Sequence, residues 1–188
     1  MASGIALIIL LPIFAIIGIF IKLDSKGPVF FIQERVGKGG KIFKTYKLRT
    51  MVLESEKMTG NNPIDKKNSY ITRIGKVLRR TGIDELPQLK NVIMGDMSLV
   101  GPRPTILCQV KGYNDFQRKR LLVKPGITGW ALVNGRNFLS WPERIMLDIW
   151  YIEHWSFWLD IKILFKTLFI VAKGEGLYNN SNFNKISK

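Results

Sequence analysis

The chain has 188 residues, enough for one domain with a substantial hydrophobic core. The 29 lysines and arginines stand against 14 aspartates and glutamates, giving a formal net charge of +15. This excess predicts attraction to polyanions: nucleic acid, an anionic membrane face or phosphorylated small molecules. The single cysteine, Cys108, excludes an intramolecular disulfide, and we interpret it as a packing residue. The single histidine, His154, excludes a histidine-based metal site and favours a surface or interfacial role.

The N-terminal segment, residues 5–21, is uncharged and mostly apolar. A helix of this length would be roughly 25 Å long, the lower limit for crossing a bilayer. Pro12 lies in its middle, where the proline ring removes a helix hydrogen bond and predicts a kink. A kinked transmembrane helix and a re-entrant helix, which enters one leaflet and returns, both fit these residues. Lys22 and Lys26 place the chain that follows in the cytoplasm.

A second membrane signal lies in residues 149–172, which combine apolar side chains, tryptophans and interleaved charges. Tryptophan suits the headgroup region of a bilayer, and lysine binds anionic lipid there. The residues with these properties are Trp150, Trp155, Trp158, Lys162 and Lys166. We predict an in-plane interfacial helix over this range. The tail at 174–188 is polar and rich in asparagine, which predicts a mobile segment.

The region between these segments predicts a small hairpin followed by helices. Residues 28–51 read as two short strands around a Gly-Lys-Gly-Gly turn, whose spacing does not match a phosphate-binding P-loop. Residues 54–67 read as a loop. An amphipathic helix is expected over 69–80, with Ile71, Ile74 and Leu78 on its apolar side.

Two adjacent carboxylates, Asp84 and Glu85, open the next predicted helix, residues 84–94. Pro87 fits there only in the first turn, and Asp84, Gln88 and Asn91 fall on one polar face opposite the apolar residues. Asp84 could serve simply as the helix N-cap, with Glu85 an ordinary first-turn acid. A carboxylate held at a helix start is also suited to act as a nucleophile or a metal ligand.

A stiff loop, Gly101 to Pro104, holds Arg103 between two prolines. Fixing an arginine in this way suits it to bind a phosphate, although a rigid turn with a solvated arginine is equally compatible with these residues. Arg49 and Arg79 could join it. Residues 124–136 are glycine-rich, and their Trp130 offers a stacking face for a nucleotide base.

Three segments taken together resemble the bacterial sugar transferase family. They are KLRTM (47–51), LRRTGIDELPQLKNVIMGDMSLVGPRP (78–104) and KPGITGWALVNGRN (124–137). Members are monotopic phosphoglycosyl transferases that initiate capsule, O-antigen, exopolysaccharide or glycoprotein glycan assembly. The resemblance implies a mainly helical α+β fold with a small β-hairpin and amphipathic interfacial helices around the active site. It divides the chain into a re-entrant helix at 1–23, a catalytic domain at 24–173 and the tail at 174–188.

The family transfers a sugar 1-phosphate from a UDP-sugar to polyprenyl phosphate, such as undecaprenyl phosphate, and releases UMP. The resemblance implies that Asp84 is the nucleophile, forming an aspartyl-phosphosugar intermediate in a ping-pong reaction. It implies that Glu85, with Asp84, holds Mg²⁺. It assigns phosphate binding to basic residues at four positions, namely Arg49, Arg79, Arg103 and Arg136.

The resemblance also favours re-entry over spanning at Pro12, with both ends cytoplasmic. We therefore expect a protein of the bacterial inner membrane with its active site on the cytoplasmic face. Expected partners are the UDP-sugar, polyprenyl phosphate and membrane lipids, but not nucleic acid. A homodimer and a monomer are both compatible with the sequence. Two features depart from the family: the MASG start, which we expect to alter anchoring, and Leu132, where glutamine is usual, which affects substrate contacts nearby.

Two other readings compete. A catalytically silent membrane scaffold of the same fold is disfavoured by the intact Asp84, Glu85, Arg49 and Arg103. A nucleic-acid-binding protein would explain the positive charge, but residues 5–21 fit a soluble chain poorly.

Overall fold

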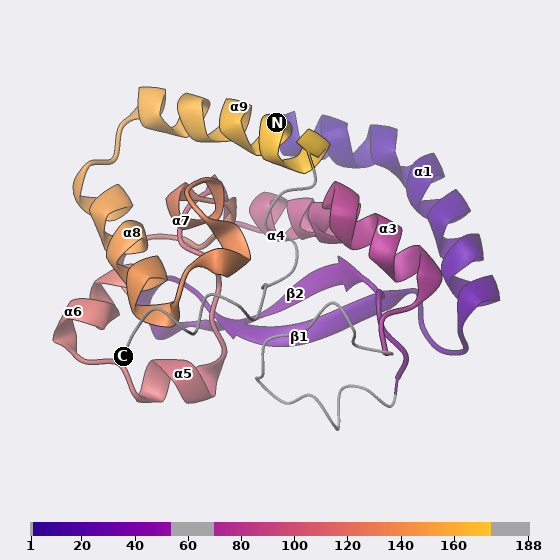
Figure 1. The fold of residues 1–188 in the computed structure, drawn as a ribbon, viewed down its shortest axis with the longest axis horizontal. Helices are drawn as coiled ribbons and strands as arrows, with labels where there is room; N and C mark the ends of the chain where they lie inside the picture. The colour runs from indigo at the N-terminus through magenta and orange to yellow at the C-terminus, as the bar shows by residue number, and fades with distance from the viewer. Residues whose placement is uncertain (1, 54–69, 174–188) are drawn as a thin grey trace.

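A computed structural model describes residues 2–53 and 70–173, and the predicted loop at 54–67 and tail at 174–188 lie outside this range. Over the described residues the fold is α+β and mainly helical, as predicted (Figure 1). The elements that position the site are α1 (Ala2–Asp24), β1 (Phe30–Val36), β2 (Ile42–Leu48), α3 (Arg73–Thr81), the 3₁₀ helix η2 (Ile83–Gln88), α4 (Leu89–Ile93), β3 (Ser98–Val100), α5 (Leu107–Lys111), α6 (Asp115–Arg118), the 3₁₀ helix η3 (Lys119–Leu122), β4 (Gly126–Thr128), α7 (Trp130–Val133), α8 (Trp141–Glu153) and α9 (Phe157–Lys173).

Strands β1 and β2 form the predicted antiparallel hairpin, in a register that pairs Phe30 with Leu48 and Val36 with Ile42. The turn between them uses Gly39 and Gly40 at φ of 66° and 82°, a left-handed backbone that glycine adopts without strain. Helices α3 and α4 lie along the hairpin in Figure 1. The hairpin therefore provides the platform on which the next segments pack.

Helix α1 confirms the predicted N-terminal helix and contains Pro12. Its Phe14 and Ile21 pack with Leu48 and Leu78 in one hydrophobic cluster. At its end the Asp24 carboxylate accepts a hydrogen bond from the backbone N–H of Ile74 at 2.9 Å, which joins α1 to the start of α3. In the part of the chain described here, no helix combines the length and apolar character needed to cross a bilayer. Re-entry remains a prediction.

The single helix predicted over 149–172 is wrong, because the chain breaks at His154 into α8 and α9. Ser156 starts the new helix, since its hydroxyl accepts from the backbone N–H of Leu159 at 3.2 Å. Asp160 fixes the corner by accepting from the Tyr151 hydroxyl at 2.7 Å and from the Trp155 indole at 3.2 Å. These side-chain bonds override the continuous helical pattern of the sequence.

A second hydrophobic cluster contains Val100, Val133, Tyr151 and Ile163 and underlies the parallel pair β3–β4. The two strands approach so closely that a Cβ on Gly126 would lie 2.1 Å from the backbone nitrogen of Gly101. The loop that carries Arg103 is thereby held against the glycine-rich segment.

Cys108, on the short helix α5, is exposed, so its interpretation as a packing residue is wrong.

Candidate active site

The carboxylate pair lies in the first turn of η2. Gly82, at φ 68°, ends α3 and forms the N-cap position of η2, so Asp84 is not the cap that the sequence also allowed. Within the described chain, no hydrogen bond reaches the Asp84 carboxylate. The predicted helix at 84–94 is a 3₁₀ turn followed by the short helix α4. This geometry leaves Asp84 available for chemistry rather than for helix capping.

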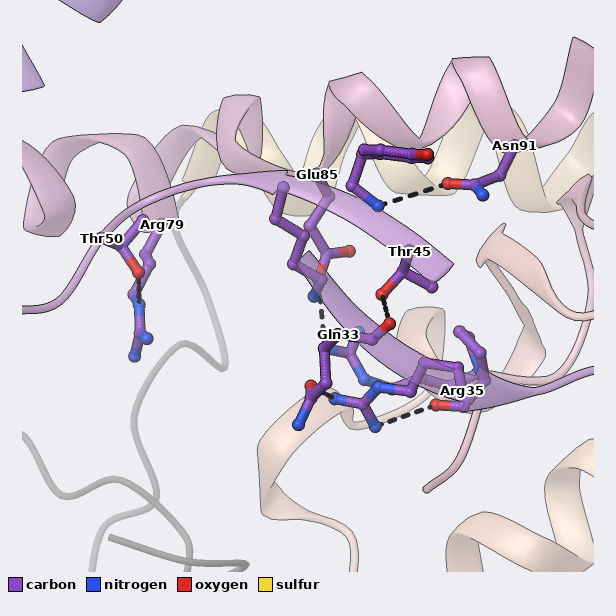
Figure 2. Close-up of polar contacts among 11 residues, drawn as sticks. Gln33, Arg35, Thr45, Thr50, Arg79, Glu85 and Asn91 are labelled. Atoms are coloured by element: carbon purple, nitrogen blue, oxygen red, sulfur yellow. Dashed lines mark hydrogen bonds and ion pairs between the residues drawn. The ribbon is translucent and has the colours of Figure 1, made fainter. Parts of the chain in front are cut away.

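Asn91 fixes η2 and α4 against the hairpin. Its side chain is fully buried, and its amide donates to the carbonyl of Lys44 at 2.7 Å. Its oxygen accepts a hydrogen bond from the N–H of Tyr46 at 3.3 Å (Figure 2). Gln88 is buried as well, so two members of the predicted polar face lie in the protein interior. The buried asparagine satisfies backbone groups of β2 that the hairpin leaves unpaired.

Glu85 is held by two cations on one oxygen. Lys47 lies 2.5 Å and Arg103 lies 3.0 Å from Glu85 Oε1. Burial opposes ionisation of Glu85, but the charges and hydrogen bonds of Arg103 and Lys47 outweigh it and hold the pKa of this carboxyl well below its usual range. Glu85 is therefore a fixed carboxylate that orients the basic groups around the pair.

Asp84 has the opposite behaviour. Burial and the neighbouring charge of Glu85 raise the pKa of Asp84 to about 6, against the pull of Lys47, Arg79 and Arg103. Desolvation raises the free energy of the ionised form, so Asp84 binds a proton more tightly than Glu85 does. Glu85 is thus ionised at neutral pH, whereas Asp84 has a raised pKa of about 6.

Lys47 was not among the predicted site residues, although it stands in the KLRTM segment. It lies on β2, opposite η2. The hydrogen bonds of Asn91 hold η2 and α4 against β2, and Glu85 thereby reaches Lys47. Arg35 on β1 was also missed. It donates to the carbonyl of Pro104 at 3.3 Å, and its charge acts on Glu85 and Arg103. Figure 2 shows Arg35 and Gln33 on the hairpin beneath Glu85.

The structure brings three of the four predicted arginines around the pair. Arg103 binds Glu85 directly. Arg79 donates to the Thr50 hydroxyl at 2.8 Å, as Figure 2 shows, and its charge acts on Asp84. Arg136 interacts electrostatically with Glu85 and Asp84. Together with Lys47 they form a cationic surround that suits a phosphorylated substrate.

Arg49 lies elsewhere. Its guanidinium is buried and donates to the carbonyl oxygens at the end of α1, at 2.6 Å to Ser25, 2.8 Å to Lys26 and 3.3 Å to Ile21. A cation at a helix C-terminus complements the unpaired carbonyls there. In this structure Arg49 anchors α1 to the end of β2, and its predicted phosphate contact stays a prediction.

Trp130 packs at the junction of α7, α8 and α9. Its ring stacks on Trp150 with centroids 5.0 Å apart, and the Lys166 ammonium lies 5.1 Å from its centroid. Leu132 is partly buried against the cluster of Val100 and Tyr151. These contacts give both residues a packing role, and the predicted stacking of Trp130 on a base stays a prediction.

The donors present fit a magnesium site completed by substrate. No cluster of three or more histidine, cysteine, aspartate or glutamate side chains occurs among the residues that the structure describes. Mg²⁺ is typically bound through one or two carboxylates, with water and substrate phosphate oxygens completing its shell. Asp84 and Glu85 supply two adjacent carboxylates, and Lys47 and Arg103 both contact Glu85 through the same oxygen, Oε1.

Comparison with known proteins gives consistent results. The sequence matches the family model for bacterial sugar transferase over residues 1–174. It is 45% identical to the uncharacterized sugar transferase EpsL of Bacillus subtilis, over 86% of this chain and 79% of that protein. It is 42% identical to the undecaprenyl-phosphate galactose phosphotransferase of Salmonella typhimurium, over 81% of this chain and 35% of that protein.

A further relative is the UDP-glucose:undecaprenyl-phosphate glucose-1-phosphate transferase of Escherichia coli, 42% identical over 87% of this chain and 37% of that protein. The matches to the Salmonella and Escherichia coli proteins thus span little more than a third of those longer chains. The family match covers α1, the hairpin and every residue of the site described above. The chain belongs to the bacterial sugar transferase family.

Proposed function

We propose that this chain is a phosphoglycosyl transferase that moves a sugar 1-phosphate from a UDP-sugar to polyprenyl phosphate and releases UMP. The observation that carries the proposal is the pairing of Asp84, whose carboxylate is destabilised by burial, with a surround of basic side chains. Such a pairing suits attack on an anionic diphosphate, because the cations offset substrate charge while the carboxylate stays reactive. Relatives named for galactose and glucose transfer support the reaction class without fixing the sugar.

In the first step, a carboxylate oxygen of Asp84 attacks the sugar-proximal phosphorus of the donor. The bond from that phosphorus to the bridging oxygen breaks, and UMP leaves with the electron pair. Asp84 then carries the sugar phosphate as an acyl phosphate. In the second step, an oxygen of the lipid phosphate attacks the same phosphorus, and the Asp84 carboxylate leaves. No net proton transfer is required in either step.

The surrounding side chains have distinct roles in this scheme. Arg103 and Lys47 keep Glu85 ionised, and both are close enough to the pair to bind diphosphate oxygens. Arg79 and Arg136 add positive charge where negative charge shifts in the transition state. Mg²⁺, when bound by Glu85 and Asp84, would supply further neutralisation of the diphosphate.

We infer that the protein works at the cytoplasmic face of the bacterial inner membrane, with α1 as a re-entrant helix. The support is the apolar surface that α1 and α9 expose, which soluble proteins rarely leave uncovered. Both helices run along the upper edge of the molecule in Figure 1. The exposed apolar side chains are Ile9, Leu11, Ile13, Ile16, Ile19, Phe20 and Leu23 on α1, and Phe157, Trp158, Phe165, Leu168 and Phe169 on α9. A site beside this surface could receive a water-soluble donor and a lipid phosphate.

The test is UMP release in detergent with Mg²⁺, undecaprenyl phosphate and a panel of UDP-sugars. We expect release with at least one sugar, and its loss in Asp84→Asn. Intact mass measured with donor alone should show the sugar phosphate on the wild type and on Glu85→Gln, but not on Asp84→Asn. The matched control is Asp96→Asn, which removes a carboxylate that pairs with Lys41 outside the site. Unchanged release in Asp84→Asn would overturn the proposed nucleophile, and no release with any sugar would favour the silent scaffold.

A further inference from the structure

The loop that carries Arg103 has four consecutive backbone carbonyls bound from outside the loop. The carbonyls of Pro102 and Thr105 accept from the backbone N–H groups of Gly126 at 2.9 Å and Val36 at 2.8 Å. Between them, the Pro104 carbonyl accepts from Arg35 and the Arg103 carbonyl accepts from Arg120 Nη2 at 3.1 Å. The backbone on both sides of Arg103 is therefore fixed by contacts from other elements, and the contact to Arg103 itself comes from Arg120.

Arg120 is itself held by a buried ion pair. Its Nε and Nη2 lie 2.9 and 2.7 Å from Asp148 Oδ2, and both side chains are only 2% exposed. Its remaining nitrogen, Nη1, donates to the Tyr113 hydroxyl. All three guanidinium nitrogens thus have partners, and Nη2 also binds the Arg103 carbonyl.

Arg136, another arginine of the site, also has its backbone carbonyl bound by an arginine side chain. Arg136 is the only non-glycine residue with positive φ in the described part of the chain, at 51°. Its carbonyl accepts from Arg144 Nη2 at 2.9 Å. Arg144 precedes Asp148 by one helical turn on α8, and its charge acts on Asp148 as well. The left-handed backbone at Arg136 is thus held by a contact from Arg144, a partly buried residue of α8 near Asp148.

A buried ion pair is weak support for stability, because desolvation of both charges offsets their attraction. The role of the Arg120–Asp148 pair is better explained by the position that it gives to the Arg120 side chain. Asp148 pairs with Arg120, and Arg120 and Arg144 each bind the backbone carbonyl of an arginine beside the carboxylate pair. In the described part of the chain, the hydrogen bonds and ion pairs of these three side chains go to residues other than Asp84 and Glu85.

We propose that Arg120, Arg144 and Asp148, hereafter the support triad, are positioning residues that set Arg103 and Arg136 for phosphate binding. Arg120 acts through the carbonyl of Arg103, and Arg144 acts through the carbonyl of Arg136. The catalytic part of this inference rests on the proposed function. The structural part, that the triad fixes the backbone at the two site arginines, does not.

The experiment uses Arg120→Lys and Arg144→Lys in the full chain, since lysine keeps the positive charge beside Asp148 but lacks the second branch of the fork. We expect kcat for UMP release to fall by about 10- to 100-fold, with a smaller change in KM, because misplacement of a phosphate-binding group acts mainly on the transition state. The matched control is Lys119→Met. Lys119 pairs at 2.7 Å with Glu153, an exposed contact that also joins η3 to α8 but does not touch the loop.

Double mutants separate positioning from a general structural effect. In an Arg103→Ala background, Arg120→Lys should lower kcat no further. In an Arg136→Ala background, it should lower kcat by the same factor as in the wild type. Arg144→Lys should show the reverse. Losses that multiply in every background would overturn the proposal, because a merely destabilised fold lowers activity regardless of which arginine is present.

Amide hydrogen exchange gives a readout that does not need activity. In Arg120→Lys, exchange should accelerate at Gly126 and Val36, whose N–H groups bind the loop, with the midpoint of thermal unfolding nearly unchanged. Unaltered exchange at both amides would overturn the positioning role. If the wild type releases no UMP with any sugar, the proposed function fails, while the exchange data still decide whether the triad sets the loop.

Discussion

Lys47 on β2 and Glu85 on η2 form an ion pair between side chains that are 18% and 19% exposed. The pair joins the hairpin to the helical turn that carries the carboxylates. Because Glu85 also binds Arg103 through the same oxygen, Lys47 is part of the cationic surround of the site. Lys47 thus contributes both to the shape of the site and to its charge.

Replacement of Lys47 tests this contribution. Lys47→Met should lower UMP release by about 10- to 100-fold, since a hydrogen bond to a charged group contributes about 1.5–3 kcal/mol. The control is Lys44→Met, which removes an exposed lysine from the same strand. Equal losses in the two variants would indicate a general effect of strand charge and would contradict a specific role for Lys47.

Arg49 distinguishes anchoring from phosphate binding. Arg49→Met should lower the midpoint of thermal unfolding, because it leaves several carbonyls at the end of α1 without their charged donor, at a cost of about 2 kcal/mol or more. The KM for the UDP-sugar should change little. A raised KM with an unchanged unfolding midpoint would instead support the phosphate contact predicted from the sequence.

Asn91 should be essential for the position of the site. Asn91→Leu removes both side-chain bonds to β2 and should destabilise the protein by about 2–3 kcal/mol, because a backbone N–H and a C=O lose their partners in the interior. Denaturant unfolding in detergent measures this. Asn134→Leu is the control, since its exposed side chain donates to the carbonyl of Trp130 four residues earlier and joins no other element through this bond. Similar losses for the two would argue against a special role of Asn91.

The raised pKa of Asp84, about 6, predicts a pH-dependent stability. A carboxyl whose pKa is higher in the folded than in the unfolded protein binds protons more tightly when folded. Stability from this group is therefore present at low pH and is lost as pH rises from about 4 to above 6. Without added metal, Asp84→Asn should gain about 1–2 kcal/mol relative to wild type between pH 4.5 and 7.5, a value reduced from the full shift because the side chain is partly exposed.

The measurement is the difference in unfolding midpoint between wild type and Asp84→Asn across that pH range, in the presence of a chelator. Other titrating groups cancel in this difference. A difference that stays constant with pH would show that the Asp84 pKa is the same in the folded and unfolded chains. A wild type that becomes relatively more stable with rising pH would reverse the sign and indicate a lowered pKa.

Local features were readable from the sequence because they depend on nearby residues. The apolar run at 5–21 and the glycine turn between the strands each predicted the element that forms. The stripe of Ile71, Ile74 and Leu78 predicted α3, but this helix begins only at Arg73, and Ile71 instead forms a β-bridge with Met51. The break at His154 was missed, because it depends on Asp160 binding Tyr151 and Trp155 across the corner. Helical periodicity carries no signal for such side-chain contacts.

The sequence by itself determined the family, through three motifs in order, and it identified Asp84, Glu85 and Arg103 as neighbours in a site. Only the tertiary structure decided which other cations reach them. Lys47 lies within β2 and faces η2, whereas Arg49 follows the last residue of the strand, where strand alternation no longer fixes the side on which a residue lies. The support triad was likewise invisible in the sequence, because Arg120 and Asp148 lie 28 residues apart and meet only through the packing of η3 against α8.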